Sequence, residues 1–120
     1  MNVEELCAYC LNKKAAEDTF PFGETTMVFK VMGKIFAILP LDVEETSIAL
    51  KCDPDRAIEL RETHPDEIIP GFHLNKQHWN TVYTETGLSS KIIQELIDHS
   101  YELIVKSLPK KIQAELENLT

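Results

Sequence analysis

Glycine is scarce in this sequence, and its scarcity excludes a large class of ligand site. The chain has four glycines among 120 residues, and they are not clustered. Loops that cradle nucleotide phosphates need closely spaced glycines, because only glycine lets the backbone approach the phosphates. The sequence therefore carries no nucleotide-binding signature, and it has no G-x-S-x-G nucleophile elbow either.

Long apolar runs and cysteines are also few. No apolar run approaches the roughly 20 residues of a membrane-spanning helix. The N-terminus lacks the basic and apolar regions of a signal peptide. The three cysteines are an odd number, which suits a reducing compartment. These absences predict a cytoplasmic protein that does not contact a membrane.

Basic residues are outnumbered, but they are not spread evenly. Lys and Arg total 12 against 20 Asp and Glu, and the formal net charge is −8. An acidic chain repels phosphate backbones at long range. Residues 25–41 nevertheless contain no acid and carry Lys30 and Lys34, and residues 68–84 contain none and carry Lys76. The corresponding hairpins are therefore neutral to basic within an acidic protein.

The sequence predicts one α+β domain over residues 1–120, with a two-layer architecture. Apolar residues make up 43% and charged residues 27%, which is typical of a globular domain. An antiparallel sheet of about five strands is expected to pack against helices, because the connections are too short for parallel crossovers. The expected helices cover residues 2–14, 53–62, 90–108 and 110–118, and the expected strands cover residues 26–31, 34–39, 47–52, 67–73 and 80–85.

Local signals fix several of these boundaries. Asn2 and Glu5 form a capping-box pattern, and Asp53 followed by Pro54 predicts a helix start. Met32-Gly33 predicts a two-residue hairpin turn in which Gly33 has positive φ. Residues 15–25 are expected to be irregular, with the rings of Phe20 and Phe22 pinning the loop to the core.

Catalytic and metal-binding patterns are not found. No nucleophile and base can be paired by their spacing, so the protein is not expected to be an enzyme. Cys7 and Cys10 form a C-x-x-C, but both fall within an apolar helix stripe, which favours core thiols. A small-ligand or metal site around His73, His78 and Asp53 is a weaker alternative, because no further Cys or acid completes the shell. Neither a metal nor a cofactor is expected.

The stretch from Pro70 to Asn80 is the densest in recognition chemistry. It holds the only Trp, Trp79, and two of the four His. Trp79 is expected either to stack on a base or to serve as a half-buried sheet anchor. Asn75 is expected either to read a base edge or, as we favour, to cap a helical turn from Lys76 to Trp79.

Two lysines of the predicted sheet occupy alternating positions. Lys30 and Lys51 each interrupt an apolar strand, so the two side chains are expected on one sheet face. One interpretation is that these lysines protect the sheet surface from aggregation. The other is that they bind a ligand.

Several segments together resemble a known family. No single segment is diagnostic, and the resemblance depends on their order and spacing. The segments are Phe20–Gly23, Val28–Val31 with Gly33-Lys34 and Phe36-Ala37, Leu50–Pro54, Pro70-Gly71 with His73, Asn75-Lys76 and His78–Asn80, and Glu95–Leu103. The sequence resembles the MmcQ/YjbR family of small bacterial proteins over essentially its whole length.

The resemblance implies an antiparallel sheet flanked by helices, similar to CyaY-like and secretion-chaperone-like folds. It also implies a DNA-binding function through a "double-wing" pair of hairpins, and it brings no catalytic residues. The DNA-binding residues that it implies are Lys30, Lys34, Lys51, Lys76, His78, Trp79 and Asn80.

A second hypothesis is a chaperone-like adaptor that binds a protein or peptide on the sheet face. The acidic composition suits this partner better than DNA, and Phe20, Phe22 and Trp79 would be its anchors. A salt series distinguishes the two hypotheses, because only DNA binding should weaken steeply with salt. The sequence leaves open whether the protein is a monomer or a dimer.

Overall fold

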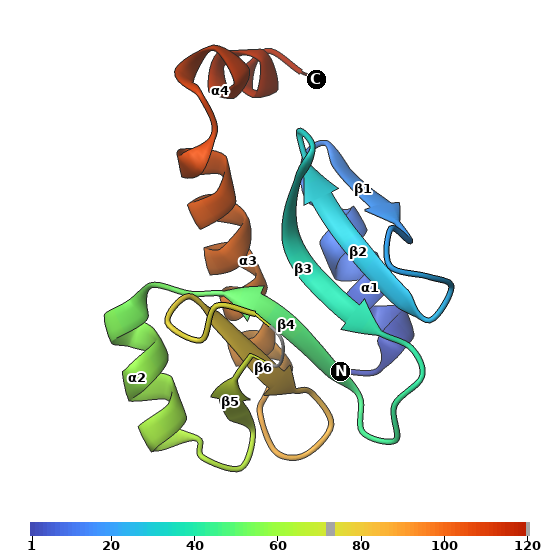
Figure 1. Cartoon of the computed structure of the whole chain (residues 1–120), viewed down its shortest axis with the longest axis vertical. Coiled ribbons are helices and arrows are strands. Elements are labelled where there is room, and N and C mark those ends of the chain that lie inside the picture. Colours follow the sequence, from blue (N-terminus) through green and yellow to red (C-terminus); the bar gives the residue numbers. More distant parts are fainter. Residues whose placement is uncertain (72–73, 120) are drawn as a thin grey trace.

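A six-stranded antiparallel sheet organises the chain (Figure 1). The computed structural model describes residues 1–71 and 74–119. The strand order is β1-β2-β3-β4-β6-β5, and every neighbouring pair is antiparallel, as predicted. The elements are α1 (Val3–Leu11), β1 (Ala16–Thr19), β2 (Thr26–Val31), β3 (Lys34–Pro40), β4 (Ser47–Lys51), α2 (Pro54–Thr63), β5 (Ile68–Pro70), β6 (Trp79–Tyr83), α3 (Ser90–Ser107) and α4 (Lys110–Glu117).

The edge strand β1 was not predicted. Its sequence, Ala-Glu-Asp-Thr, has neither β-branched enrichment nor apolar alternation. A turn at residues 12–15, in which Ala15 has φ 60°, reverses the chain after α1. Backbone pairing with β2 then makes the strand, with Ala16 opposite Val31. Tertiary pairing therefore outweighs weak local propensity here.

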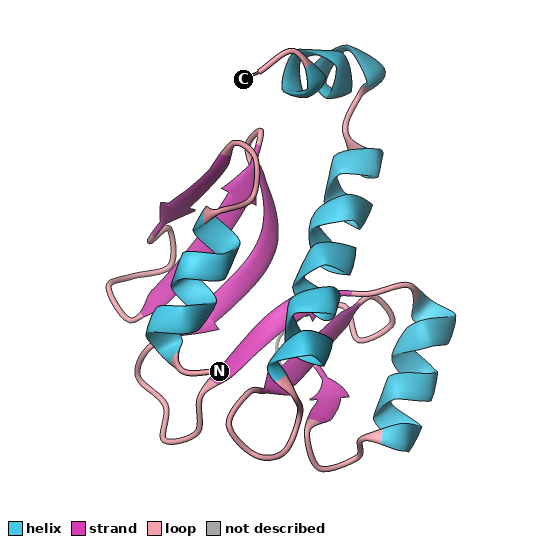
Figure 2. Cartoon of the chain, turned by 180° about the vertical axis from the view of Figure 1, so that it is seen from behind, coloured by secondary structure: helices cyan, strands magenta, loops and turns pink. Residues whose placement is uncertain are grey.

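Helices α1 and α3 lie together against one face of the sheet (Figure 2). Ser100, at the centre of α3, is fully buried: its hydroxyl donates to the Phe36 carbonyl at 2.5 Å and accepts from the Lys51 N–H at 2.9 Å. This small side chain lets α3 approach β3 and β4 closely. Ser107, in the last turn of the same helix, is exposed. Within the described part of the chain, no helix has the length and apolar character to cross a membrane.

The predicted caps and hairpin turn are confirmed. Asn2 and Glu5 make both hydrogen bonds of a capping box, and the Asp53 carboxylate accepts the Arg56 N–H at 3.3 Å. Met32 and Gly33 have φ 49° and 85°, the two positive values that a tight hairpin turn matching the sheet twist requires. One extra residue in β3 makes a bulge opposite Phe29 and Lys30, so Phe36 and Ala37 both face the core.

The aromatic rings of the loop between β1 and β2 do not pack against the core. Phe20 is 44% exposed and Phe22 is 66% exposed, so the prediction for these rings is wrong. The loop joins the edge strand β1 to β2. The core lies between the sheet and the helices, and its buried aromatic rings come from Phe29 and Phe36 instead.

Candidate functional site

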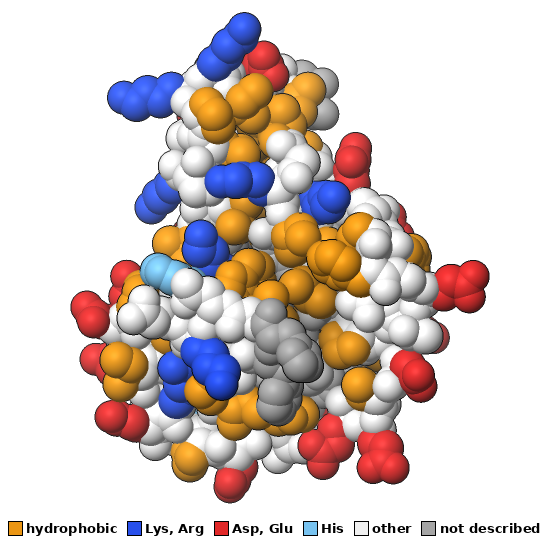
Figure 3. Space-filling model, in the orientation of Figure 1, with side chains coloured by type: hydrophobic (Ala, Val, Ile, Leu, Met, Phe, Trp, Pro, Cys, Tyr) orange, Lys and Arg blue, Asp and Glu red, His pale blue; other side chains and the backbone are white. Residues whose placement is uncertain are grey.

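The sheet face opposite α1 and α3 carries several of the predicted site residues. Strand register and side-chain alternation define this helix-free face. Figure 3 views it, with apolar side chains across its middle, most of the basic side chains over its upper half, a smaller basic group to the left of the grey residues, and acidic side chains along its left, lower and right margins. The residues that register assigns to it on β2, β3, β4 and β6 are Thr26, Val28, Lys30, Ile35, Ile38, Pro40, Ser47, Ala49, Lys51, Trp79, Thr81 and Tyr83.

Lys30, Lys51 and Trp79 share one end of the helix-free face. Lys51 is directly opposite Trp79 across the β4–β6 ladder. Lys30 lies two strands away on β2, opposite Ile35 of β3. The prediction that Lys30 and Lys51 share a face is confirmed. Trp79 is half-buried, so its ring is partly anchored and partly available to a ligand.

Lys34 extends this basic end toward the C-terminal helices. Its Nζ donates to the Ser107 hydroxyl at 3.0 Å, which joins the β2–β3 hairpin to the last turn of α3. Residues 103–114 contain no acid and carry Lys106, Lys110 and Lys111, all exposed. We call the six residues Lys30, Lys34, Lys51, Lys106, Lys110 and Lys111 the lysine end; they make up half of the chain's 12 Lys and Arg.

The three C-terminal lysines were not predicted as site residues. The acid-free segment of residues 103–114 is the same kind of signal that identified residues 25–41 and 68–84. What the sequence did not show is that the α3–α4 junction lies beside the hairpin. The Lys34–Ser107 hydrogen bond supplies that information.

Lys76 and His78 lie in the turn that leads into β6. The Asn75 side chain accepts the Gln77 N–H at 2.9 Å, which confirms Asn75 as a cap. Lys76 is exposed and His78 is half-buried. The Arg61 guanidinium of α2 donates to the Lys76 carbonyl and to the Trp79 carbonyl, so Arg61 positions this turn through its backbone.

Asn80 is placed differently from the other predicted site residues. It is 2% exposed, and register puts it on the face that packs against the helices. Its Oδ1 accepts the Arg61 Nε–H at 2.7 Å. This amide therefore has a structural role in tying α2 to β6, and it does not lie on the helix-free face with Lys51 and Trp79.

The cysteine pair is mostly enclosed by the core. Cys10 is fully buried, and burial raises the pKa of its thiol to about 12. Cys7 is half-buried, with its Sγ 3.5 Å from the Met27 Sδ, and burial raises its pKa as well. Redox and metal chemistry require a thiolate. Among the described residues, no group of three or more His, Cys, Asp and Glu side chains converges as a metal site would.

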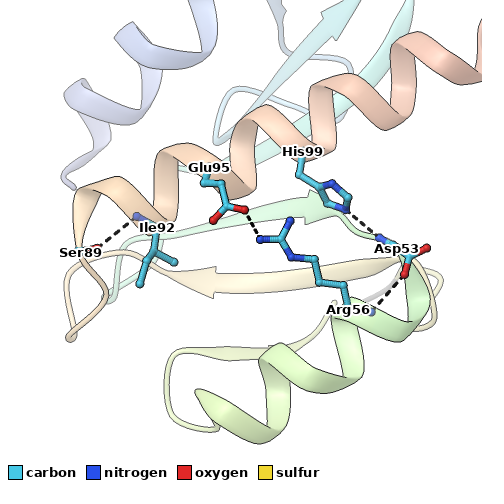
Figure 4. A network of polar contacts seen from close by, with 6 residues as sticks. All are labelled: Asp53, Arg56, Ser89, Ile92, Glu95 and His99. Carbon is cyan, nitrogen blue, oxygen red and sulfur yellow. Dashed lines mark hydrogen bonds and ion pairs between the residues drawn. The ribbon is translucent and has the colours of Figure 1, made fainter.

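A polar network joins α2 to α3 (Figure 4). The His99 Nε2 accepts the backbone N–H of Asp53 at 3.2 Å, and Arg56 forms an ion pair with Glu95. Burial, followed by the nearby Arg56 charge, lowers the pKa of His99, although Asp53, Glu95 and Glu102 act in the opposite direction. The geometry explains the neutral form, because a protonated Nε2 cannot accept this hydrogen bond.

The lowered pKa of His99 predicts a loss of stability in mild acid. The folded state favours neutral imidazole, so the contribution is present above the unfolded pKa of 6.5 and is lost as pH falls from that value to the lower pKa of the folded state. Urea midpoints measured from pH 8 to pH 5 should therefore decline more steeply for the wild type than for His99→Gln, whose amide keeps an acceptor. Parallel declines in the two proteins would contradict this role for His99.

Comparison with known proteins places the chain among relatives of the same size. A family model described as YjbR matches residues 11–103. The chain is 35% identical to YjbR of Escherichia coli K12 over 111 residues, which cover 92% of this chain and 93% of the relative. It is 37% identical to YbdF of Escherichia coli O157:H7 over 94 residues, covering 78% of this chain and 76% of the relative.

Solved structures of similar proteins have the same fold. The crystal structure of Deinococcus radiodurans DR2400, a protein with a DUF419 domain, aligns with a TM-score of 0.90 at 36% identity and covers 97% of this chain and 88% of that one. A Pseudomonas syringae protein aligns with a TM-score of 0.72 at 26% identity, covering 86% of this chain and 98% of that one. Neither description names a ligand or a reaction, so any functional argument depends on the residues of this chain.

Proposed function

The chain belongs to the YjbR family, and from this premise and its own surface chemistry we propose that it is a non-enzymatic DNA-binding protein. DNA would lie against the lysine end. The β2–β3 hairpin would form one wing, and the turn that carries Lys76 and His78 would form the other.

One observation carries the proposal. Lys30, Lys51 and Trp79 occupy the same end of one sheet face, although they come from three different strands. Two inter-strand spacings separate β2 from β4, about 10 Å, so the two lysines reach different phosphates. The exposed part of the half-buried Trp79 next to them offers a surface for stacking on a base or packing on a sugar.

The net charge of −8 determines what kind of binding to expect. Lysine–phosphate contacts supply most non-specific affinity, and their number sets the salt dependence. The acidic remainder of the protein weakens long-range attraction. Glu17 is also opposite Lys30 in the β1–β2 register and offsets part of its charge. We therefore expect local, strongly salt-dependent binding rather than tight non-specific coating of DNA.

Trp79, the only tryptophan, serves as a reporter for this proposal. Titration with a short DNA duplex, and separately with single-stranded DNA, should produce a saturable change in tryptophan fluorescence at low salt. The change should fade as salt rises toward physiological strength, because phosphate contacts are lost. A mobility-shift assay on the same samples provides an independent measure of binding.

The same titration separates DNA binding from the peptide-binding alternative. If neither fluorescence nor mobility changes at low salt, the DNA proposal is wrong. A peptide that binds through apolar contacts would be nearly insensitive to salt. A saturable signal that persists unchanged across the salt series would likewise argue against phosphate recognition.

A further inference from the structure

An apolar groove lies on the helix-free face, at the opposite end from the lysines. Its volume is about 750 Å³, within the range of sites that hold small molecules. Ile38, Ala49 and Thr81 form part of its floor on three adjacent strands. Phe22 and Leu74, from two different loops, form part of its walls.

The rim of the groove exposes apolar side chains to solvent. Phe22 is 66% exposed and Val43 is 48% exposed. The ring of Phe22 is thus left on the groove wall instead of in the core. An apolar ligand in the groove would remove this surface from water, which is the main driving force of such binding.

The charge of the groove is of one sign. Glu44 and Glu45 line it, and among the residues that the structure describes its lining includes no Lys, Arg or His. Among the described residues, neither glutamate makes an ion pair. The nearest residue of the lysine end on β4, Lys51, is four positions from Ser47 at the glutamate end of the floor. That separation is about 14 Å, which exceeds the Debye length of about 8 Å at physiological salt.

We propose that this groove binds a small organic cation, with an apolar body against the sheet and an ammonium or guanidinium group beside Glu44 and Glu45. The carboxylates attract the charge, and the aromatic rings of Phe22 and Tyr83, which also line the groove, provide faces on which a cation is favoured. An anionic ligand of the same shape would be repelled by the two glutamates.

The dimensions favour a small molecule over a peptide helix. The floor extends from β2 to β6, three inter-strand spacings or about 14 Å, and about 7 Å along the strands. An average helix of three to four turns is longer than 15 Å, and it is about 10 Å wide with its side chains. The floor is thus too short and too narrow to seat such a helix, whereas it matches one compact ligand.

A pair of probe molecules tests the proposal. Benzyltrimethylammonium, followed by amide chemical shifts in NMR spectra of the full chain, should bind saturably and shift the amides of Ile38, Ala49 and Thr81. The anion 4-methylbenzenesulfonate should bind at least roughly tenfold more weakly. Glu44→Gln with Glu45→Gln should weaken binding of the cation about fivefold, because two exposed charge pairs each contribute a factor of about 1.5 to 5.

Matched variants keep the outcome interpretable. Glu59→Gln with Glu62→Gln removes the same charge from exposed positions on α2 and should leave binding of the cation unchanged. Equal binding of cation and anion, equal effects of the two double variants, or no saturation would each overturn the proposal. The groove does not depend on the proposed DNA contacts, so Lys30→Gln, which tests those contacts, should leave binding of the cation unchanged.

Discussion

A variant with both Lys30→Gln and Lys51→Gln is expected to bind DNA about 60-fold more weakly than the wild type at about 0.1 M salt. For each lysine that neutralises a phosphate, the binding constant gains a factor equal to the molar salt concentration raised to a power of about −0.9. At about 0.1 M salt this factor is about eightfold. Two such contacts multiply. The slope of log affinity against log salt should also become shallower by about 1.8, and fluorescence anisotropy of labelled duplex across a salt series measures both quantities.

The double variant changes the net charge of the protein as well as the charge at the proposed site, and Lys91→Glu is the control that separates these two effects. It brings the net charge from −8 to −10, as the double variant does. Lys91 is exposed in the first turn of α3, whereas Ser107, which contacts the lysine end, closes the last turn. We expect Lys91→Glu to retain near wild-type affinity. If it weakens binding as much as the double variant, net charge governs binding and the face is not the site.

The extent of the site can be tested at the same net charge. Lys110→Gln with Lys111→Gln also gives −10 and alters the first turn of α4. A loss of affinity comparable to that of the Lys30 and Lys51 variant would extend the site onto α4. Unchanged affinity would confine the phosphate contacts to the sheet.

The sequence predicted those parts of the fold that are determined locally. The positive φ at Gly33, the capping box at Asn2 and Glu5, and the start of α2 at Asp53 all depend on a few neighbouring residues, and all three are confirmed. The strand β1 depends instead on pairing with β2, and nothing in its own composition signals a strand. The exposure of Phe22 also depends on distant parts, because a loop ring is buried only if another element covers it.

The candidate site likewise has features that local sequence rules predict and features that only the tertiary structure reveals. Alternation alone placed Lys30 and Lys51 on one face, because side chains in a strand have a period of two. The same alternation places Asn80 on the face that packs against the helices. Its structural role could not be predicted, because its partner Arg61 lies 19 residues away in the sequence, on α2. The groove could not be predicted from the sequence at all, because Phe22, Val43 and Leu74 come from three separate loops that only the fold brings together. Such a site is determined by tertiary structure and has no sequence motif.

The largest loss of stability is expected for Phe29→Ala, at about 3 to 5 kcal/mol. Phe29 is fully buried on β2, and its ring lies 6.3 Å from the ring of Phe36. Phe36 in turn makes an edge-to-face contact with Tyr101 of α3 at 5.3 Å. Removing the first ring leaves a cavity between the sheet and α3 that close-packed neighbours fill only in part. Urea unfolding followed by far-UV circular dichroism measures the change.

The same substitution at Phe22 is the matched control. Phe22 is 66% exposed, so Phe22→Ala leaves no cavity and should change the free energy of unfolding by less than about 0.5 kcal/mol. A domain of this size is typically stable by about 5 to 15 kcal/mol, so Phe29→Ala is expected to remove a large part of the total while the m-value stays constant. A loss below about 1 kcal/mol for Phe29→Ala would mean that the core does not depend on this ring. Similar losses at both positions would contradict the distinction between a buried Phe29 and a groove-lining Phe22, on which both the fold and the groove depend.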